Sequence, residues 1–147
     1  MKCIELNRKG DYDCWSGTDL AELHRLQTCE DFYEYSLYRG KDVKMGLIIL
    51  EPYERTPFRM LKNNFKLVAL SGGEAVTRFS NGGISLMLFE RGECVSLCVD
   101  GRTMINDLQN IGVDVLVMAL IEYKDSFSSD GGSPLSFQLE TPVFNVH

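Results

Sequence analysis

The sequence predicts an α+β fold: an antiparallel β-meander with a following helix and a long central strand, and helices packed on the sheet. Three observations support this prediction. Apolar and polar residues alternate in four consecutive segments between residues 65 and 99, which is typical of strands. Asn81-Gly82 lies between two of these segments, and this dipeptide favours a type I′ hairpin turn. Residues 113–123 are apolar on both alternating faces, as in a central strand that is covered on both sides.

The remaining strands are assigned in chain order. Residues 2–7 and 11–15 are each interpreted as a short strand, and the apolar run 43–50 is a longer one that Pro52 closes. The four strands of the meander are 65–70, 75–80, 84–89 and 94–99. We expect one domain over residues 1–147, with residues 124–147 as a loosely packed loop and tail. Within that tail, 135–139 and 143–146 form an edge hairpin or dock elsewhere.

Three helices are predicted from start signals and apolar spacing. The first begins at Ser16, which has capping-box-like spacing to Asp19, and continues towards Tyr38. The second begins at Thr56-Pro57, a hydroxyl cap followed by proline at the first helical position, and ends at Asn63-Asn64. Asp100 caps the third, whose apolar residues follow helical spacing until Gly112 ends it.

Composition limits the function classes. The 147 residues include 44% hydrophobic and 24% charged residues, as in an ordinary globular chain, and the net charge is −6. An acidic balance argues against coating of nucleic acid, because phosphates repel it. No apolar run approaches the roughly 20 residues of a transmembrane helix, and the N-terminus lacks the apolar core of a signal peptide. We therefore expect a cytoplasmic protein.

Basic residues without intervening acids form the clearest local charge pattern. Arg55, Arg59, Lys62 and Lys66 are spaced by four, three and four residues, so they share one face if the second predicted helix extends that far. That face is a candidate anionic-ligand-binding site, for RNA, a nucleotide or a lipid headgroup. The alternative interpretation is an ordinary solvated face of a surface helix.

An acidic and aromatic segment lies near the end of the first predicted helix. Its candidate partner-binding residues are Glu30, Asp31, Tyr33, Glu34 and Tyr38. The partner would be another protein, a basic one, or a second copy bound head to tail through the basic face. The alternatives are charges that serve only solubility and aromatic rings that belong to the core.

Catalytic and metal-binding patterns are weak. A cysteine nucleophile would rely on His24, because the other histidine, His147, ends the sequence. Cys29 is nearest in sequence, but five residues on a helix separate the two side chains by about 140°. The cysteine count of five is odd and no CxxC pair occurs, so reduced thiols are expected; the cysteines are Cys3, Cys14, Cys29, Cys94 and Cys98. No metal site, nucleotide loop or cofactor is predicted.

These observations lead to one hypothesis and two alternatives. The leading hypothesis is a non-catalytic interaction or assembly factor, of the viral accessory, matrix or toxin-neutralising immunity type, that masks a charge-complementary partner. The first alternative is the anionic-ligand binder, and the second is an enzyme with a cysteine nucleophile. Nucleic acid or a membrane surface enters only as the partner in the first alternative.

Overall fold

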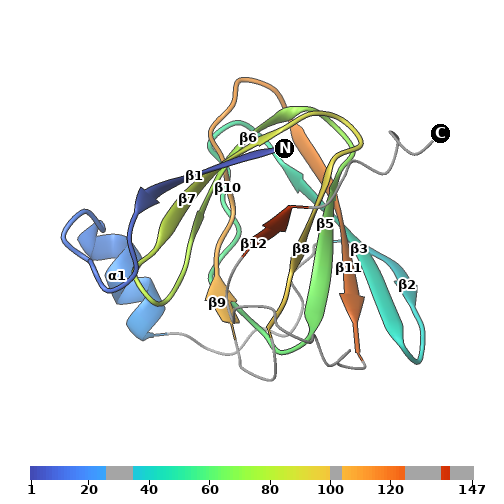
Figure 1. Cartoon of the computed structure of the whole chain (residues 1–147), viewed down its shortest axis with the longest axis horizontal. Helices are drawn as coiled ribbons and strands as arrows, with labels where there is room; N and C mark the ends of the chain where they lie inside the picture. Colours follow the sequence, from blue (N-terminus) through green and yellow to red (C-terminus); the bar gives the residue numbers. More distant parts are fainter. Residues whose placement is uncertain (26–34, 100–103, 125–136, 140–147) are drawn as a thin grey trace.

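The structure is a computed structural model that describes residues 1–25, 35–99, 104–124 and 137–139. It is built mostly from β-strands, which form two antiparallel sheets and one two-stranded ribbon around a shared apolar core (Figure 1). The helix of the described residues, α1 (Gly17–His24), lies at the end of the molecule beside β1 and β7. It is neither long nor apolar enough to cross a membrane.

The larger sheet contains six strands. Their order is β12 (Phe137–Leu139), β8 (Cys94–Leu97), β5 (Asn64–Ala69), β11 (Leu116–Tyr123), β3 (Val43–Leu50) and β2 (Tyr35–Arg39). β11 therefore lies inside the sheet, between β5 and β3, which confirms the predicted central strand. Leu116, Met118 and Leu120 point from β11 into the core and are at most 1% exposed.

The smaller sheet has four strands in the order β1 (Lys2–Asn7), β7 (Ile84–Phe89), β6 (Gly73–Arg78) and β10 (Gln109–Asn110). A separate ribbon pairs β4 (Arg59–Leu61) with β9 (Met104–Asn106). Side chains from both sheets meet in one core; Phe65 and Leu67 come from the larger sheet, and Met87 and Phe89 from the smaller. Burial of this apolar surface is the main force that holds the two sheets together.

The predicted α+β class is wrong, and so is the predicted meander. β6 and β7 pair as a hairpin, but β5 and β8 pair with each other in the opposite sheet. The chain thus crosses between sheets where the sequence pattern indicated neighbours along one sheet. Alternation of apolar residues identifies a strand with one buried face, and it carries no information about which strand is its neighbour.

Two predicted helices are strands or loops. The segment after Thr56-Pro57 contains β4, and the segment before Gly112 contains β9 and β10. Both were predicted from start signals and a few apolar residues at helical spacing, which are weak guides when tertiary pairing competes. The first helix is confirmed only over Gly17–His24, because residues 35–39 form strand β2. Residues 26–34 of that prediction lie outside the described residues.

The positions of the strands were predicted more accurately than those of the helices. β1, β3 and β7 coincide with the predictions, and the predicted strands at 65–70, 75–80, 94–99 and 113–123 are shifted or shortened at their ends. The predicted strand at 11–15 is wrong, since these residues form turns. In the tail, Phe137–Leu139 pairs with β8 at the sheet edge, and residues 143–146 lie outside the described part.

The hairpin between β6 and β7 is present, but its turn is not type I′. Only Gly82 has a positive φ, of 95°, and its amide donates to the Phe79 carbonyl at 2.9 Å. Phe79 N–H in turn donates to the Gly83 carbonyl. Such a turn followed by a left-handed glycine is the usual longer hairpin loop. Trp15 Nε1 and Asn7 Nδ2 both donate to the Gly82 carbonyl, which ties the turn to the N-terminal segment.

Candidate functional site

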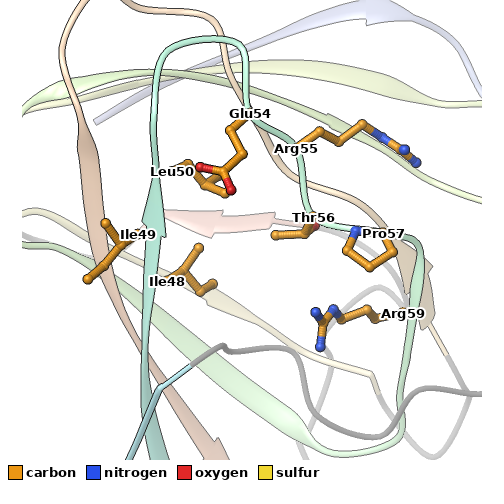
Figure 2. A pocket seen from close by; sticks show the side chains of 8 residues that line it. All are labelled: Ile48, Ile49, Leu50, Glu54, Arg55, Thr56, Pro57 and Arg59. Carbon is orange, nitrogen blue, oxygen red and sulfur yellow. The ribbon is translucent and has the colours of Figure 1, made fainter.

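A cleft of about 250 Å³ lies between the end of β3 and the segment that follows it (Figure 2). Its described lining comprises Ile48, Ile49, Leu50, Glu54, Arg55, Thr56, Pro57 and Arg59. The chain reverses after Leu50 so that residues 54–59 run back alongside the strand. Tyr53, which has a left-handed φ of 67°, sits in this reversal, and the Glu54 N–H donates to the Glu51 carbonyl at 2.9 Å.

The far wall of the cleft is fixed by backbone and hydroxyl hydrogen bonds. Thr56 N–H donates to the Leu108 carbonyl at 2.8 Å, and Leu108 N–H donates to Thr56 Oγ1 at 2.9 Å. Asn110, fully buried, donates from Nδ2 to the Leu50 carbonyl at 2.9 Å and to the Asp114 carbonyl at 2.8 Å. Both walls are therefore tied to the segment around β10, which makes the cleft a preformed feature.

Opposite charges lie at the two ends of the cleft. The Glu54 carboxylate lies beside Leu50, and the Arg59 guanidinium lies at the other end, towards Ile48 (Figure 2). Glu54 Oε2 accepts from Glu51 N–H at 2.8 Å, which orients the carboxylate. Arg55 lines the cleft with its stem, but its guanidinium points away from β3. The cleft therefore offers one carboxylate and one guanidinium above an apolar floor.

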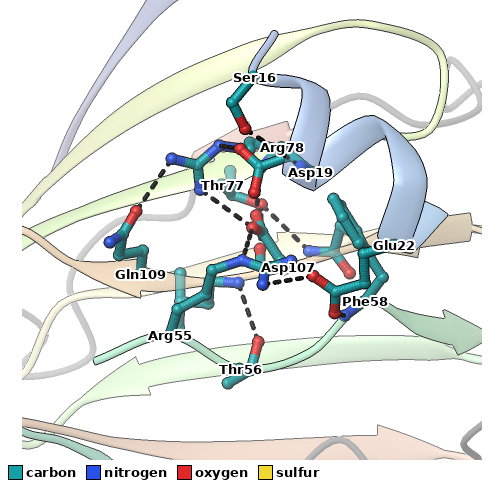
Figure 3. Close-up of polar contacts among 12 residues, drawn as sticks. Ser16, Asp19, Glu22, Arg55, Thr56, Phe58, Thr77, Arg78, Asp107 and Gln109 are labelled. Carbon is teal, nitrogen blue, oxygen red and sulfur yellow. Dashed lines mark hydrogen bonds and ion pairs between the residues drawn. The ribbon is translucent and has the colours of Figure 1, made fainter. Parts of the chain in front are cut away.

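The Arg55 guanidinium belongs to a buried ionic network behind the cleft (Figure 3). Asp107 is 0% exposed, and its carboxylate accepts from Arg55 Nε at 2.6 Å and from Arg78 Nη1 at 3.0 Å. Its second oxygen accepts from the Arg78 backbone N–H at 2.7 Å. Burial raises the pKa of the Asp107 carboxyl, and the guanidiniums and the amide offset only part of that effect.

Helix α1 supplies the outer acids of this network. Arg55 Nη1 donates to Glu22 Oε2 at 2.6 Å, and Arg78 Nε lies 3.4 Å from Asp19 Oδ2. The Arg55 guanidinium also lies 4.7 Å from the centre of the Phe58 ring. Burial lowers the pKa of Arg55, but the hydrogen bonds and charges of Asp107 and Glu22 outweigh burial and raise it, so this guanidinium stays charged. Its charge is balanced inside the protein by Asp107 and Glu22.

The four predicted basic residues do not share one face. Arg55 and Arg59 both line the cleft, but Lys62 lines a separate hollow of about 190 Å³ beside Glu122. Lys66 lies on β5, in register with Ile121 of β11. The predicted basic helix face is therefore wrong, because residues 59–66 contain two strands and the loop between them.

Four of the predicted partner-binding residues, Glu30, Asp31, Tyr33 and Glu34, lie outside the described residues. The fifth, Tyr38, is on edge strand β2 and is 56% exposed. Its ring lies against Gly40, where an added Cβ would come within 2.5 Å of Tyr38 Cε1. An outward position for Tyr38 is thus confirmed, while its role in binding a partner stays a prediction.

The described residues give no support to a Cys–His hydrolase. His24 Nδ1 lies 2.7 Å from the Leu20 carbonyl within its own helix. Cys14 is exposed, Cys94 is buried, and neither is hydrogen-bonded to His24 in the described part of the chain. Cys29 and His147 lie outside that part.

Sequence reasoning missed Glu54, Glu22 and Asp107. Each is a common charged residue with no motif around it, and Arg55 and Asp107 are 52 residues apart. The absence of acids from residue 55 to 66 did single out Arg55 and Arg59. No local signal could show that Asp107 neutralises one of them.

Comparison with known proteins identifies the fold. No protein-family model matches the chain, and no curated protein matches its sequence. A cupin domain from Bordetella pertussis Tohama I matches with a TM-score of 0.56 at 14% identity, over 68% of this chain and 99% of that one. A conserved Klebsiella pneumoniae protein with a double-stranded β-helix domain matches with a TM-score of 0.52 at 10% identity, over 81% and 94%.

A third similar structure is an RmlC-like cupin family protein from Methanocaldococcus jannaschii, with a TM-score of 0.50 at 16% identity, over 67% of this chain and 91% of that one. At these identities the likeness establishes the fold alone, which is the double-stranded β-helix of cupin domains. The predicted viral accessory, matrix or immunity-type factor is therefore wrong, because its structural neighbours are cupin-domain proteins.

A metal site would need several ligating side chains that converge among the described residues. Among them, no three His, Cys, Asp or Glu side chains converge. The space between the sheets is filled by apolar side chains such as Phe65, Leu67 and Phe89, which have no atom that ligates a metal ion. The described interior does not fit a metal, and no chemistry is derived through one.

Proposed function

We propose that this protein binds a small zwitterionic molecule, of the size and type of a free amino acid, in the cleft beside β3. The observation that carries the proposal is that Glu54 and Arg59 lie at opposite ends of one cleft. A carboxylate is a hydrogen-bond acceptor for an ammonium group, and a guanidinium binds a carboxylate through parallel N–H groups. A ligand that carries both charges has one charged group for each end of the cleft.

The floor and the volume support the same class of ligand. Ile48, Ile49 and Leu50 form the apolar part of the cleft lining, which suits a ligand with an aliphatic side chain. The volume of about 250 Å³ lies just below the roughly 300–1,000 Å³ range of ordinary ligand pockets. A metabolite of a few heavy atoms fits this size better than a nucleotide does. Because the Arg55 guanidinium is paired with Glu22 and Asp107, it is not directed at a ligand in the cleft, and this argues against a polyanion there.

Binding, and no reaction, is proposed. Thr56 carries the hydroxyl of the described lining, and its oxygen is already held by Leu108 N–H. A cytoplasmic location is part of the proposal. Cys3, Cys14, Cys94 and Cys98 are free thiols, as expected in a reducing compartment.

For an aliphatic ligand, the test uses three molecules with the same side chain: leucine, isopentylamine without the carboxylate, and 4-methylpentanoate without the amine. A thermal-shift screen of all amino acids first finds the best side chain, and calorimetry then compares it with its two truncated analogues. We expect each truncation to weaken binding at least tenfold, because a charged hydrogen bond contributes about 1.5–3 kcal/mol. Analogues that bind as well as the amino acid, or a screen without binders, would refute the proposal.

Variants of the two charged residues test whether the ligand binds in the cleft. Glu54→Gln should lower the affinity for the amino acid and leave the affinity for the amine-free analogue unchanged. Arg59→Gln should lower the affinity for the amino acid and leave the affinity for the carboxylate-free analogue unchanged. Glu90→Gln and Lys41→Gln remove the same charge types from exposed positions outside the cleft lining, so they should bind as the wild type does. Equal effects of cleft and control variants would move the site elsewhere.

A further inference from the structure

Four chain connections lie together at one end of the molecule, which we call the loop end. Hydrogen bonds hold them there: Tyr53 N–H donates to the Asn110 carbonyl at 2.8 Å, and Gly92 N–H donates to the Ala69 carbonyl at 2.7 Å. In Figure 1 they are at the upper end of the molecule. The loop end comprises the connections at residues 51–54, 70–72, 90–92 and 111–115.

Apolar side chains are exposed on these connections. Val113 is 85% exposed and Tyr53 is 69% exposed, while Leu70 and Val115 are 44% and 38% exposed. They are four of the nine large hydrophobic side chains that are exposed among the described residues. Exposed apolar side chains that gather on one surface mark a place where another molecule docks, because contact there removes apolar area from water.

The charges around these side chains are mostly of one sign. Arg91 is the exposed base of the loop end, and its exposed carboxylates are Glu51, Glu54, Glu74, Glu90 and Asp114. Negative charge repels nucleic acid and anionic lipid headgroups. A two-fold contact with a second copy would bring these carboxylates against one another, which is unfavourable. The complementary partner is therefore positively charged, and it is also partly apolar.

A hollow of about 310 Å³ gives this surface a shape as well as a charge. It lies between two of the connections, and its described lining is Gly72, Gly73, Glu74, Ile111, Gly112, Val113 and Asp114. Ile111 N–H donates to the Glu74 carbonyl at 3.1 Å, and this bond ties the two walls together. Three glycines leave the hollow open, since they contribute no side chain to fill it.

Two carboxylates of the hollow are available to a partner. Neither Glu74 nor Asp114 forms an ion pair or a side-chain hydrogen bond with a described residue. A lysine or arginine side chain can lay its aliphatic stem along Ile111 and Val113 and present its charge to both carboxylates. The hollow thus accepts a single basic side chain, with room for apolar neighbours on Leu70 and Val115.

We propose that the loop end binds a basic, partly apolar segment of another protein, with a lysine or arginine side chain in the hollow between Glu74 and Asp114. Charge complementarity fixes the basic residues of that segment, and the exposed apolar side chains around the hollow fix the rest. This surface is separate from the amino-acid cleft, although Glu54 belongs to both, so Glu54 is left unchanged in the variants that test it.

The probe is a set of short synthetic peptides that contain arginine and leucine in varied order. Two matched sets replace arginine by glutamate or leucine by serine. Fluorescence anisotropy of the labelled peptides measures the affinity. We expect the best arginine–leucine peptide to bind at least tenfold more tightly than either of its matched peptides, because each replacement removes one of the two complementary features. A set without any binder would overturn the proposal.

Two double variants place the peptide. Glu74→Gln/Asp114→Asn removes the charges of the hollow, and Leu70→Ser/Val113→Ser removes apolar area beside it. Each should lower the affinity for the best peptide at least tenfold. The charge variant should keep the wild-type affinity of the cleft for its amino acid, so the two proposals can fail separately. Wild-type affinity for the peptide in both variants would overturn the proposal.

Matched controls make the same kinds of change elsewhere. Glu5→Gln/Asp13→Asn removes two exposed carboxylates, and Leu6→Ser/Leu37→Ser removes two leucines that are each 55% exposed. Both should bind the peptide as the wild type does, and an equal loss of affinity in them would overturn the proposal. So would wild-type binding to anionic phospholipid vesicles, or self-association that Leu70→Ser/Val113→Ser abolishes, since either result gives the loop end another occupant.

Discussion

At the scale of single residues, Asp107 is the most constrained side chain of the site. It is fully buried and accepts from two arginines that come from different segments, while its backbone carbonyl accepts from Thr77 Oγ1 at 2.7 Å. A buried ion pair contributes little net stability over an apolar replacement, but the loss of one partner leaves the other charge buried and uncompensated. Asp107 therefore fixes the positions of Arg55 and Arg78 more than it adds to stability.

The variant Asp107→Asn should lower the free energy of unfolding by about 3–5 kcal/mol, because an amide removes the buried charge that both guanidiniums share and leaves them only the half-buried acids Glu22 and Asp19. Urea unfolding at neutral pH measures the loss. Asp114→Asn changes an exposed carboxylate near the same segment and should stay within about 0.5 kcal/mol of the wild type. Equal stability of the two variants would show that Asp107 does not form its ion pairs with Arg55 and Arg78 in solution.

At the scale of elements, two glycines should respond to the same substitution with opposite signs. Gly82 has a φ of 95°, and an added Cβ would lie 3.0 Å from the Asp11 carbonyl oxygen. Gly82→Ala should therefore destabilise the protein by about 1–3 kcal/mol through backbone strain. Gly17, in α1, has no heavy atom within 4 Å of its added Cβ. Gly17→Ala should leave stability unchanged or raise it by up to about 1 kcal/mol.

Differential scanning calorimetry of the two alanine variants tests the turn and the helix together. A Gly82→Ala protein as stable as the wild type would mean that the turn relaxes, and that its ties to Trp15 and Asn7 are loose. A destabilised Gly17→Ala protein would mean that α1 begins differently from the described helix.

At the scale of the whole molecule, pairing between distant segments dominates. β1 pairs with β7 about 80 residues later, and β11 inserts between β3 and β5. Loop closure must precede these contacts, so we expect refolding in milliseconds to seconds or slower. Stopped-flow fluorescence of Trp15, which is buried against Phe58, reports the rate. Refolding within microseconds would contradict this topology.

The same distant pairing explains what could be predicted from the sequence. Strands such as β3 and β7 were located because alternation is a local property, and β11 was recognised as central because both of its faces are apolar. The two-sheet arrangement could not be predicted, since nothing within β5 shows that its neighbours are β8 and β11. The residues of the cleft could be predicted only in part. The basic cluster indicated Arg55 and Arg59, but the acids that pair with Arg55 lie in distant segments of the chain.

Helix α1 has no fully buried residue, and ion pairs of Asp19 with Arg78 and of Glu22 with Arg55 tie it to the rest of the protein. An attachment of this kind constrains the two acids and the half-buried Leu20 and Leu23. The remaining positions of the helix are exposed: Gly17, Thr18, Ala21 and His24. For protein engineering, the exposed positions of α1 are therefore suitable sites for a recognition tag or a fluorophore, because substitutions there leave the β-sheets unchanged.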